Sequence, residues 1–276
     1  MNLSEMRKIL GEREIQLTKS LGQNFLHDGN QLRRIVEAAR LTPDDNVLEI
    51  GPGLGPLTEL LLENSRRVLA IEMDKRLVGF LSERFKEPKL EIVHGDGLEI
   101  ARDKARDWTD WKLVANLPYS VASPILVELA DNPRAPKSMT VTLQIEVAER
   151  IQAKAGDADY GLLSLLLQVR YEPMGFFKIP AASFFPAPDV DSACITLELR
   201  REPLLAIEAL PKFKRIVKKA FSERRKMMMK LLKREWPAEK LARAFEEVGL
   251  SAQIRAEAVT LEQFVRLTSC LTNDPA

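Results

Sequence analysis

The chain has 276 residues, of which 45% are hydrophobic, and its 41 Lys or Arg against 40 Asp or Glu give a formal net charge of +1 at pH 7. This length suits one sizeable domain plus a smaller one, and the near-neutral charge argues against indiscriminate coating of nucleic acid. The apolar runs fall far short of the roughly 18 residues that a membrane span requires. Cys194 and Cys270 have neither metal-ligand spacing nor the density of a disulfide scaffold. We therefore expect a cytoplasmic protein that binds no metal and no membrane.

Three regions follow one another along the chain. Residues 1–40 predict a charged leader and a helix over Gln31–Ala39, packed on the domain that follows. Residues 41–201 alternate between strand and helix patterns, which include the apolar run Leu162–Val169 and a last strand over Ala193–Leu199. Residues 202–276 turn helical. We expect an α/β domain with a small all-helical domain at its C-terminal end.

A glycine loop follows the first apolar strand, Asn46–Ile50. The sequence Gly51-Pro52-Gly53-Leu54-Gly55 precedes a helical pattern over Pro56–Asn64. In this order the backbone can approach a ligand at a helix N-terminus, which carries partial positive charge. A dinucleotide fingerprint requires the third glycine one place later, to seat a pyrophosphate. The loop therefore favours a ligand without phosphates.

Carboxylates end the next two predicted strands. Arg67–Ile71 leads to Glu72, which can accept both hydroxyls of a ribose, and Leu90–His94 leads to Asp96, which can accept a hydrogen bond from an adenine amine. Either acid by itself is equally typical of a helix cap or a turn. Because ligands bind at the carboxyl ends of strands in open α/β sheets, the succession of loop and acids favours a nucleoside site.

The segment Asn116-Leu117-Pro118-Tyr119 ends the next apolar run, Leu113–Ala115. An Asn side-chain oxygen and the carbonyl that precedes a proline can each accept one N–H of a planar amine, which localises the nitrogen lone pair and aims it at an electrophile. Tyr119 could stack on the ring that carries the amine. A proline turn with a half-buried tyrosine is the simpler alternative. The segment, taken with the upstream pocket, predicts an amino-group methyltransferase.

At this point the chain resembles the ribosomal RNA adenine dimethyltransferases, and within them the small-subunit enzymes. The similarity covers about Leu17 to Leu267, and its motifs occur in the family's order. Besides the loop, Glu72, Asp96 and the Asn116 segment, they comprise Leu21–Leu26, Phe184–Ser192 and Phe221–Lys226. After Lys226 the family usually has Thr-Leu and a polar residue, where this chain has Met227-Met228-Met229. That departure puts in doubt any polar contact there.

The resemblance implies a Rossmann-like domain that uses S-adenosylmethionine as methyl donor. It assigns the donor pocket to Asn24, Leu26, Gly51, Gly53, Glu72, Asp96 and Asn116. The N-terminal helix would then place Asn24 and Leu26 as a lid over the donor. For the flipped adenine it implies that Asn116 and the carbonyl of Pro118 hold the amine, while Tyr119 and Phe185 form two flat walls. We expect the neighbouring Phe184 to belong to the core.

The implied substrate is small-subunit (16S) ribosomal RNA within an immature small subunit, dimethylated on the 6-amino groups of two adjacent adenosines in a hairpin loop near the 3′ end. A local charge excess agrees with an RNA partner: residues 211–236 contain eleven Lys or Arg and two Glu. Helical spacing of the apolar residues predicts that the cations face outward. The expected RNA contacts are Lys214, Arg215, Lys218, Lys219, Arg224 and Arg225. We expect a monomer.

Two other classes of function stay open from the residues. The first is another methyltransferase with the same amine grip, acting on large-subunit RNA, a DNA adenine or a protein amide. The DNA and protein enzymes usually have proline in place of Leu117 and lack a basic helical tail. The second is a ribosome assembly factor with dispensable catalysis, or a dinucleotide-binding protein, against which the glycine spacing argues.

Overall fold

The computed structural model describes residues 1–15, 17, 23–223 and 225–272. By its internal contacts the chain forms two compact units. The first, the sheet unit, comprises Met1–Ala148 and Pro173–Leu199, and the second, the helical unit, comprises Glu149–Glu172 and Arg200–Ala276. Each unit has a hydrophobic core of its own.

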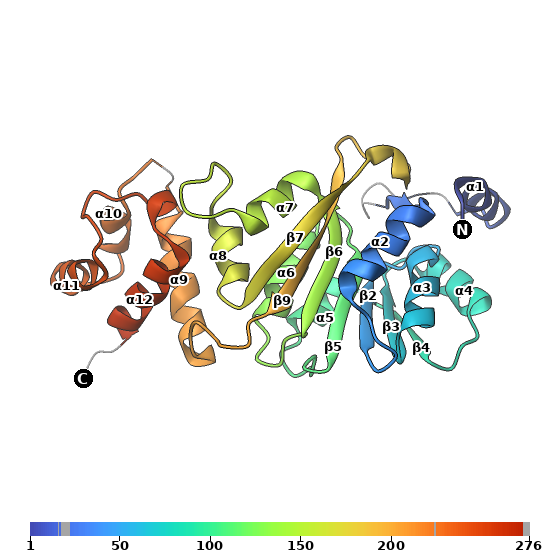
Figure 1. Cartoon of the computed structure of the whole chain (residues 1–276), viewed down its shortest axis with the longest axis horizontal. Helices are drawn as coiled ribbons and strands as arrows, with labels where there is room; N and C mark the ends of the chain where they lie inside the picture. The colour runs from blue at the N-terminus through green and yellow to red at the C-terminus, as the bar shows by residue number, and fades with distance from the viewer. Residues whose placement is uncertain (16, 18–22, 224, 273–276) are drawn as a thin grey trace. The chain divides into compact units, whose positions relative to one another are not determined.

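The strands and helices of the sheet unit alternate over most of its length (Figure 1). The strands are β1 Phe25–Leu26, β2 Asn46–Ile50, β3 Arg67–Glu72, β4 Leu90–His94, β5 Trp111–Asn116, β6 Ser138–Gln144, β7 Tyr171–Ile179, β8 Phe184–Phe185 and β9 Ser192–Leu199. The helices are α1 Leu3–Glu12, α2 Gly29–Ala39, α3 Pro56–Asn64, α4 Lys75–Arg84, α5 Gly97–Arg102, α6 Ala122–Ala130 and the short 3₁₀ helix η2 Ala181–Ser183. Helix α7, Ile145–Gln152, and strand β7 each contain residues of both units.

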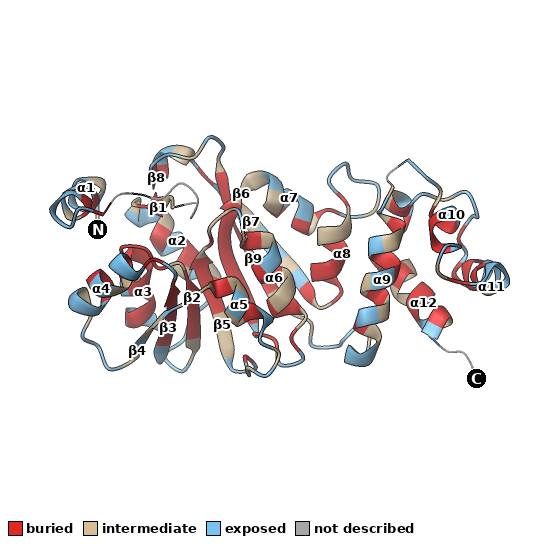
Figure 2. Cartoon of the chain, turned by 180° about the vertical axis from the view of Figure 1, so that it is seen from behind, coloured by how far each residue is buried: buried red, intermediate tan, exposed pale blue. Residues whose placement is uncertain are grey.

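Seven of the described strands form one sheet in the order β4-β3-β2-β5-β6-β9-β7. Strands β2 to β6 are parallel, and β9 pairs with β6 in the antiparallel sense. Figure 1 shows α2 and α3 on one face of the sheet, and Figure 2, seen from behind, shows α5 and α6 on the other. Strands covered on both faces are mostly apolar, as Val47, Leu48 and Ile50 of β2 are, and the buried Glu49 is the exception in this strand. The predicted Rossmann-like fold is confirmed.

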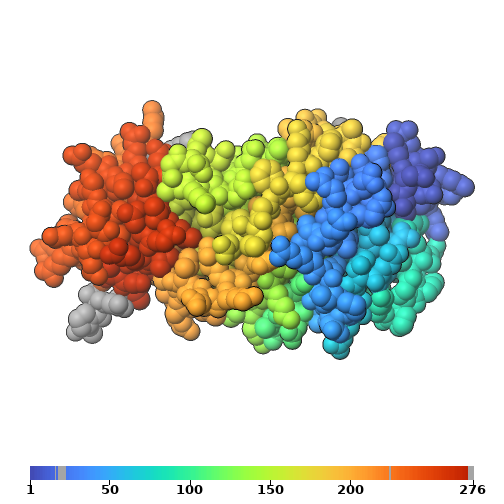
Figure 3. Space-filling view, viewed as in Figure 1, coloured from blue at the N-terminus to red at the C-terminus, as the bar shows by residue number. Residues whose placement is uncertain are grey.

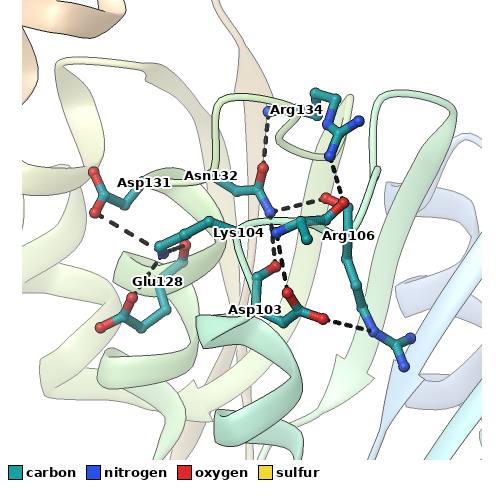
Figure 4. A network of polar contacts seen from close by, with 8 residues as sticks. Asp103, Lys104, Arg106, Glu128, Asp131, Asn132 and Arg134 are labelled. Carbon is teal, nitrogen blue, oxygen red and sulfur yellow. Dashed lines mark hydrogen bonds and ion pairs between the residues drawn. The ribbon is translucent and has the colours of Figure 1, made fainter.

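A polar network fixes the edge of the sheet at which β5 and β6 begin (Figure 4). The buried Asn132 donates from Nδ2 to the carbonyls of Asp103 (3.4 Å) and Arg106 (3.1 Å), and its Oδ1 accepts from the Arg134 N–H (2.8 Å). Lys104 Nζ pairs with Glu128 Oε2 at 2.7 Å. These bonds join the segment before β5 to the segment before β6. They therefore help to hold the two parallel strands in register at the ends where the strands begin. The opposite edge is left for a ligand.

The N-terminal residues belong to the sheet unit, and α1 lies beside α4 (Figure 3). Met6, Leu10 and Ile15 share a buried cluster with Phe25 of β1 and with Leu54, Leu77, Phe80 and Leu81. Strand β1 pairs with β8 in the antiparallel sense, which sets Phe25 opposite Phe185 and Leu26 opposite Phe184. Segments from the two ends of the unit therefore meet at the glycine loop after β2.

The helical unit has α8 Leu162–Gln168, α9 Leu210–Ala220, α10 Met228–Leu232, α11 Ala238–Val248 and α12 Leu261–Thr272, with the short 3₁₀ helices η3 Ile207–Ala209 and η4 Ala256–Ala258. Leu165 and Val169 share its core with residues such as Phe213, Phe245 and Phe264. The run Leu162–Val169 therefore packs with the C-terminal helices, and the boundary expected at residue 201 misses this insertion. Met228 and Met229 are core residues too. No described helix has the length and apolar character needed to cross a bilayer.

Candidate active site

A cavity of about 240 Å³ opens at the carboxyl ends of β2, β3, β4 and β5. Each of these strands contributes the residues that directly follow it, because parallel strands end at the same edge of the sheet. The cavity, which we call the donor pocket, brings together the predicted residues Asn24, Leu26, Gly51, Gly53, Glu72, Asp96, Asn116, Pro118 and Tyr119. Among the described residues, no group of His, Cys, Asp and Glu side chains is arranged to hold a metal ion.

The glycine loop reaches this pocket through backbone conformations that favour glycine. Gly51 has φ +74° and Gly53 has φ +61°. A Cβ on Gly53 would lie 2.6 Å from Cε1 of Phe25. The space next to Gly53 is therefore filled by the ring of Phe25, which itself lines the pocket. At this position glycine is required by the packing of the N-terminal segment, in addition to the ligand access predicted from the sequence.

Glu72 bridges the glycine loop and the start of α4. Its Oε2 accepts from the Gly53 N–H (3.1 Å) and its Oε1 from the Asp74 N–H (2.8 Å). Burial raises the pKa of this carboxyl, and the backbone N–H groups of Asp74, Gly53 and Met73 oppose the shift. A carboxylate offers about four lone-pair sites, more than these donors use. Glu72 can therefore hold the loop and still accept ligand hydroxyls.

Glu49 is a second buried carboxyl in the donor pocket, and the sequence analysis missed it. It lies on β2, is 1% exposed, and accepts a hydrogen bond from Thr58 Oγ1 of α3 (2.7 Å). Burial raises its pKa to about 8; the Thr58 bond lowers the pKa and the charge on Glu72 raises it further. A glutamate within an otherwise apolar strand, one residue from the glycine loop, was the available signal.

Asp96 is both a helix cap and a pocket residue. Its Oδ1 accepts from the Leu98 N–H (2.8 Å) at the start of α5, and the residue lines the pocket after β4. The cap function, which the sequence left as an alternative, is thus present. It uses one carboxylate oxygen only. The other oxygen is compatible with the predicted contact to an adenine amine.

The amide of Asn116 is oriented by the N-terminal segment. Its Nδ2 donates to the carbonyl of Asn24 (2.9 Å), whereas its Oδ1 is buried and has no hydrogen-bond partner among the described residues. A buried acceptor without a donor costs free energy of about 1–3 kcal/mol. The protein bears this cost at the residue predicted to hold an amine. An N–H donor from a ligand would remove it.

The residues after Asn116 are held by their own bonds. The N–H of Leu117 donates to the Thr142 carbonyl, and the Pro118 carbonyl accepts from the Val121 N–H, each at 3.1 Å. Tyr119, half-buried in the pocket wall, pairs its hydroxyl with Ser192 Oγ at 2.6 Å. Burial raises the pKa of Tyr119, so it stays a neutral phenol. The ring is thereby anchored at its far end.

Phe185 is not among the described residues that line the pocket. Its ring lies under the guanidinium of Arg7 of α1, 5.0 Å from Cζ to the ring centroid, and packs against the cluster around Phe25. This arrangement does not support the predicted stacking role, because α1 covers the ring. Phe184 is buried in the core, as predicted.

The predicted RNA contacts lie in the helical unit, mostly on α9. The apolar face of α9, with Phe213, Ile216, Val217 and Ala220, is buried as the spacing predicts. Lys218, Arg215 and Arg225 are exposed, whereas Lys214 and Lys219 are half-buried. Arg224 lies outside the described residues. We call the described set the basic surface: Lys214, Arg215, Lys218, Lys219 and Arg225.

Part of the basic surface is paired with Glu235, which the charge count did not anticipate. Glu235 Oε2 lies 2.5 Å from Arg215 Nε, and its Oε1 lies 3.3 Å from Lys219 Nζ. These cations, Arg215 first, hold the pKa of Glu235 below its usual range. Arg215 also lies over the ring of Trp236, 5.1 Å from the centroid. Two of the predicted RNA contacts thus have intramolecular partners.

The family model described as ribosomal RNA adenine dimethylase matches residues 15–273. The chain belongs to this family. Its membership confirms the predicted reaction class, S-adenosylmethionine-dependent dimethylation of ribosomal RNA adenine. The pocket fits such a donor on its own evidence, through the glycine loop, the buried carboxyls and the unpaired Asn116 oxygen.

Individual relatives agree with the family. The chain is 38% identical over 264 residues to ribosomal RNA small subunit methyltransferase A of Geobacter metallireducens, covering 93% of this chain and 96% of that protein. It is also 38% identical to the protein of that name from Clostridium perfringens, covering 98% of each. Among solved structures, the 23S rRNA methyltransferase ErmE superposes with a TM-score of 0.69 at 30% identity, covering 90% of this chain and 100% of that one. A dimethyladenosine transferase from Plasmodium falciparum, at 24% identity and a TM-score of 0.74 over 88% of this chain and 95% of that one, shares the fold.

Proposed function

We propose that this protein dimethylates the 6-amino groups of two adjacent adenosines in small-subunit ribosomal RNA, within an immature small subunit. The observation that carries the proposal is the Oδ1 of Asn116, which is buried, has no hydrogen-bond partner among the described residues, and belongs to a residue that lines a pocket suited to a nucleoside donor. A methyl acceptor that brings an N–H to this oxygen satisfies it. An aromatic amine is such an acceptor, and its lone pair requires the same contact to become localised.

The residues of the pocket have separate duties in this proposal. Glu72 accepts the ribose hydroxyls, and Asp96 accepts an amine of the donor's base. Asn116 and the Pro118 carbonyl accept the hydrogens of the substrate amine, while the anchored ring of Tyr119 supports the base. When bound, S-adenosylmethionine supplies an electrophilic methyl group on a sulfonium. The chain's contribution is then positioning, since no side-chain nucleophile is needed for attack by a neutral amine.

Asn24 connects donor binding with the amine grip. It lines the pocket, and its carbonyl accepts from Asn116 Nδ2, which leaves Asn116 Oδ1 as the atom available to a substrate amine. A donor that settles the Asn24 segment also fixes the orientation of the Asn116 amide. We therefore infer that donor binding precedes productive binding of the adenosine.

The choice of small-subunit RNA rests on the relatives. Those at 38% identity are named for the small subunit, whereas ErmE, named for 23S RNA, is 30% identical. Large-subunit RNA is accordingly the second candidate. The basic surface supports an RNA partner in either case, because exposed Lys and Arg neutralise phosphates without regard to sequence.

The test supplies labelled donor together with immature small subunits, mature small subunits or large subunits, and then maps the methylated nucleotides. We expect two adjacent dimethyladenosines in the immature small subunits and none in the large subunits. Labelling of large-subunit RNA alone would replace the proposal by its second candidate. A catalytic requirement is separable from an assembly duty by repeating the assay with the Asn116→Ala protein, which is expected to bind the particle without labelling it.

A further inference from the structure

The hydroxyl of Tyr119 forms a hydrogen bond with Ser192, which lies 73 positions further along the chain. The two oxygens are 2.6 Å apart, a short distance for a pair of hydroxyls. Ser192 is fully buried, whereas Tyr119 is half-buried and its residue lines the donor pocket. The bond therefore connects a ring that a ligand can reach to a group that water cannot reach.

Ser192 is fixed in place by the end of β6. It is the first residue of β9 and lies opposite Gln144 of β6 in the antiparallel register. The preceding residue, Asp191, accepts the Ile145 N–H at its carbonyl (3.1 Å) and the Ala181 N–H at Oδ1 (2.8 Å). These bonds leave the serine hydroxyl little freedom to move.

The backbone that leads to Tyr119 is attached to the same strand. Asn116 lies opposite Thr142 of β6, and the Leu117 N–H donates to the Thr142 carbonyl (3.1 Å). The Tyr119 ring is thus held near its base by the backbone and at its tip by the Ser192 hydroxyl. Strand β6 supports both the amine grip and the anchor of the ring, so their relative position is fixed.

Two methyl transfers to one nitrogen place different demands on this site. In each, the lone pair of the substrate amine forms a bond to the donor's methyl carbon as the C–S bond breaks with its electron pair left on sulfur, and the nitrogen then loses a proton to water. The first transfer can use two acceptors, Asn116 Oδ1 and the Pro118 carbonyl. A monomethylated amine keeps one N–H and can contact only one of them. The orientation of the base then depends more on the ring beside it.

We propose that Ser192 is a positioning residue for the second methyl transfer, which it supports by holding the ring of Tyr119 against the monomethylated base. The inference rests on the proposed function, because it assumes that Tyr119 supports the substrate base. It deepens that function by assigning the step from monomethyladenosine to dimethyladenosine to Ser192, which is not among the described residues that line the donor pocket.

The experiment follows both products in immature small subunits that are supplied with labelled donor. Digestion of the RNA at intervals gives the rates at which monomethyladenosine and dimethyladenosine form. The wild-type chain is compared with Ser192→Ala and with Tyr119→Phe, which removes the same bond from the other partner and keeps the ring. Ser65→Ala is the matched control, because Ser65 is also buried and its Oγ donates to the Leu61 carbonyl at 2.6 Å.

We expect Ser192→Ala to slow the second transfer about tenfold and the first by less than about threefold, so that monomethyladenosine accumulates. Tyr119→Phe should give the same product ratio, and the double variant should lose no more than either single one, because all three lack one and the same bond. The donor affinity measured by calorimetry should stay unchanged, and Ser65→Ala should behave as wild type.

The alternative outcomes separate this inference from the proposed function. Equal slowing of both transfers, or additive losses in the double variant, would overturn the role of Ser192 and leave the proposed function intact. If Ser192→Ala did not fold, Tyr119→Phe would decide the question, and wild-type dimethylation by that variant would overturn the inference. If the wild-type chain formed no dimethyladenosine in small subunits, the proposed function itself would fail.

A measurement without substrate tests the anchor directly. The chain has three tyrosines, so the ring signals of selectively labelled tyrosine can be assigned by nuclear magnetic resonance, and Tyr119→Phe identifies the signal of Tyr119. In Ser192→Ala we expect faster rotation of this ring, seen as averaging of its two edges. The signals of Tyr160 and Tyr171 should match those of wild type. An unchanged Tyr119 signal would overturn the inference.

Discussion

The donor pocket and the basic surface treat charge in opposite ways. In the pocket, Glu49 and Glu72 are almost fully buried, and their pKa values are raised because water is excluded. On the basic surface the cations are exposed or half-buried, and two of them share Glu235. In the pocket, each carboxyl therefore acts through its own hydrogen bonds, and salt has little effect on it because it is buried. On the basic surface the cations act together on a partner, and salt screens their attraction.

The largest expected effect is on methyl transfer and comes from removing one pocket atom, the Oδ1 of Asn116. Asn116→Ala removes the unpaired acceptor and should lower methyl transfer by about 10²- to 10³-fold. The donor should bind more weakly but measurably, because the Asn24 carbonyl loses its donor while Glu72 and Asp96 remain. Single-turnover transfer and calorimetric donor affinity measure the two effects separately. Asn64→Ala, at an exposed asparagine that ends α3, is the control, and wild-type turnover in the Asn116 variant would refute the amine grip.

The basic surface should respond to removal of several charges together. Replacing Lys214, Arg215, Lys218 and Lys219 with Ala is expected to lower RNA affinity about 10- to 100-fold at low salt. The slope of log K against log salt should also become shallower, by roughly 0.7 for each phosphate that the protein no longer neutralises. Donor affinity should stay unchanged. Fluorescence titration of an RNA hairpin across a salt series makes the measurement.

A matched set of exposed cations in the sheet unit is the control for this experiment: Lys8, Arg33, Lys86 and Lys137. These four substitutions change the net charge of the protein by the same amount. If both sets flattened the salt dependence equally, the helical unit would have no special part in RNA binding.

The residues that line the pocket could be grouped from the sequence because the end of each strand is indicated by the local residue pattern. Each apolar run ended in a residue with a distinctive side chain, and parallel pairing then required these ends to meet. Strands β2 and β4 have the bounds that their apolar runs predicted. The insertion around α8 was assigned to the wrong core, since a run such as Leu162–Val169 indicates burial without indicating which apolar partners it meets.

Two details of the site depended on contacts between distant segments. The position of Phe185 is decided by α1, whose Arg7 covers the ring, and nothing near residue 185 indicates this. Arg215 and Lys219 pair with Glu235 because the chain turns back after α9 and brings the segment that follows α10 against α9. A count of charges along the chain records the excess but not which cations are already satisfied.

The packing that closes the pocket offers a test of moderate effect. Gly53→Ala would place a methyl group 2.6 Å from Phe25 Cε1 at a residue with φ +61°. We expect a loss of roughly 1–3 kcal/mol in the free energy of unfolding together with weaker donor binding, since Phe25 lines the pocket. Gly79→Ala is the matched control, because Gly79 lies within α4 and no atom is within 4 Å of its added Cβ. That change should stabilise by about 0.5–1 kcal/mol, and similar behaviour of the two variants would contradict the packing argument.

The smallest expected effect is on RNA affinity and comes from Glu235, beside the basic surface. Glu235→Gln frees Arg215 and Lys219 and removes one negative charge from beside the basic surface. These ion pairs lie at the partly exposed surface, where such pairs contribute about 1 kcal/mol or less to stability, so the free energy of unfolding should change little. RNA affinity should instead increase roughly two- to fivefold at low salt, and the gain should vanish as salt screens it. Glu239→Gln, at an exposed residue of α11, changes the net charge equally without touching those cations. An equal gain in both variants would mean that total charge, rather than the two released side chains, governs binding.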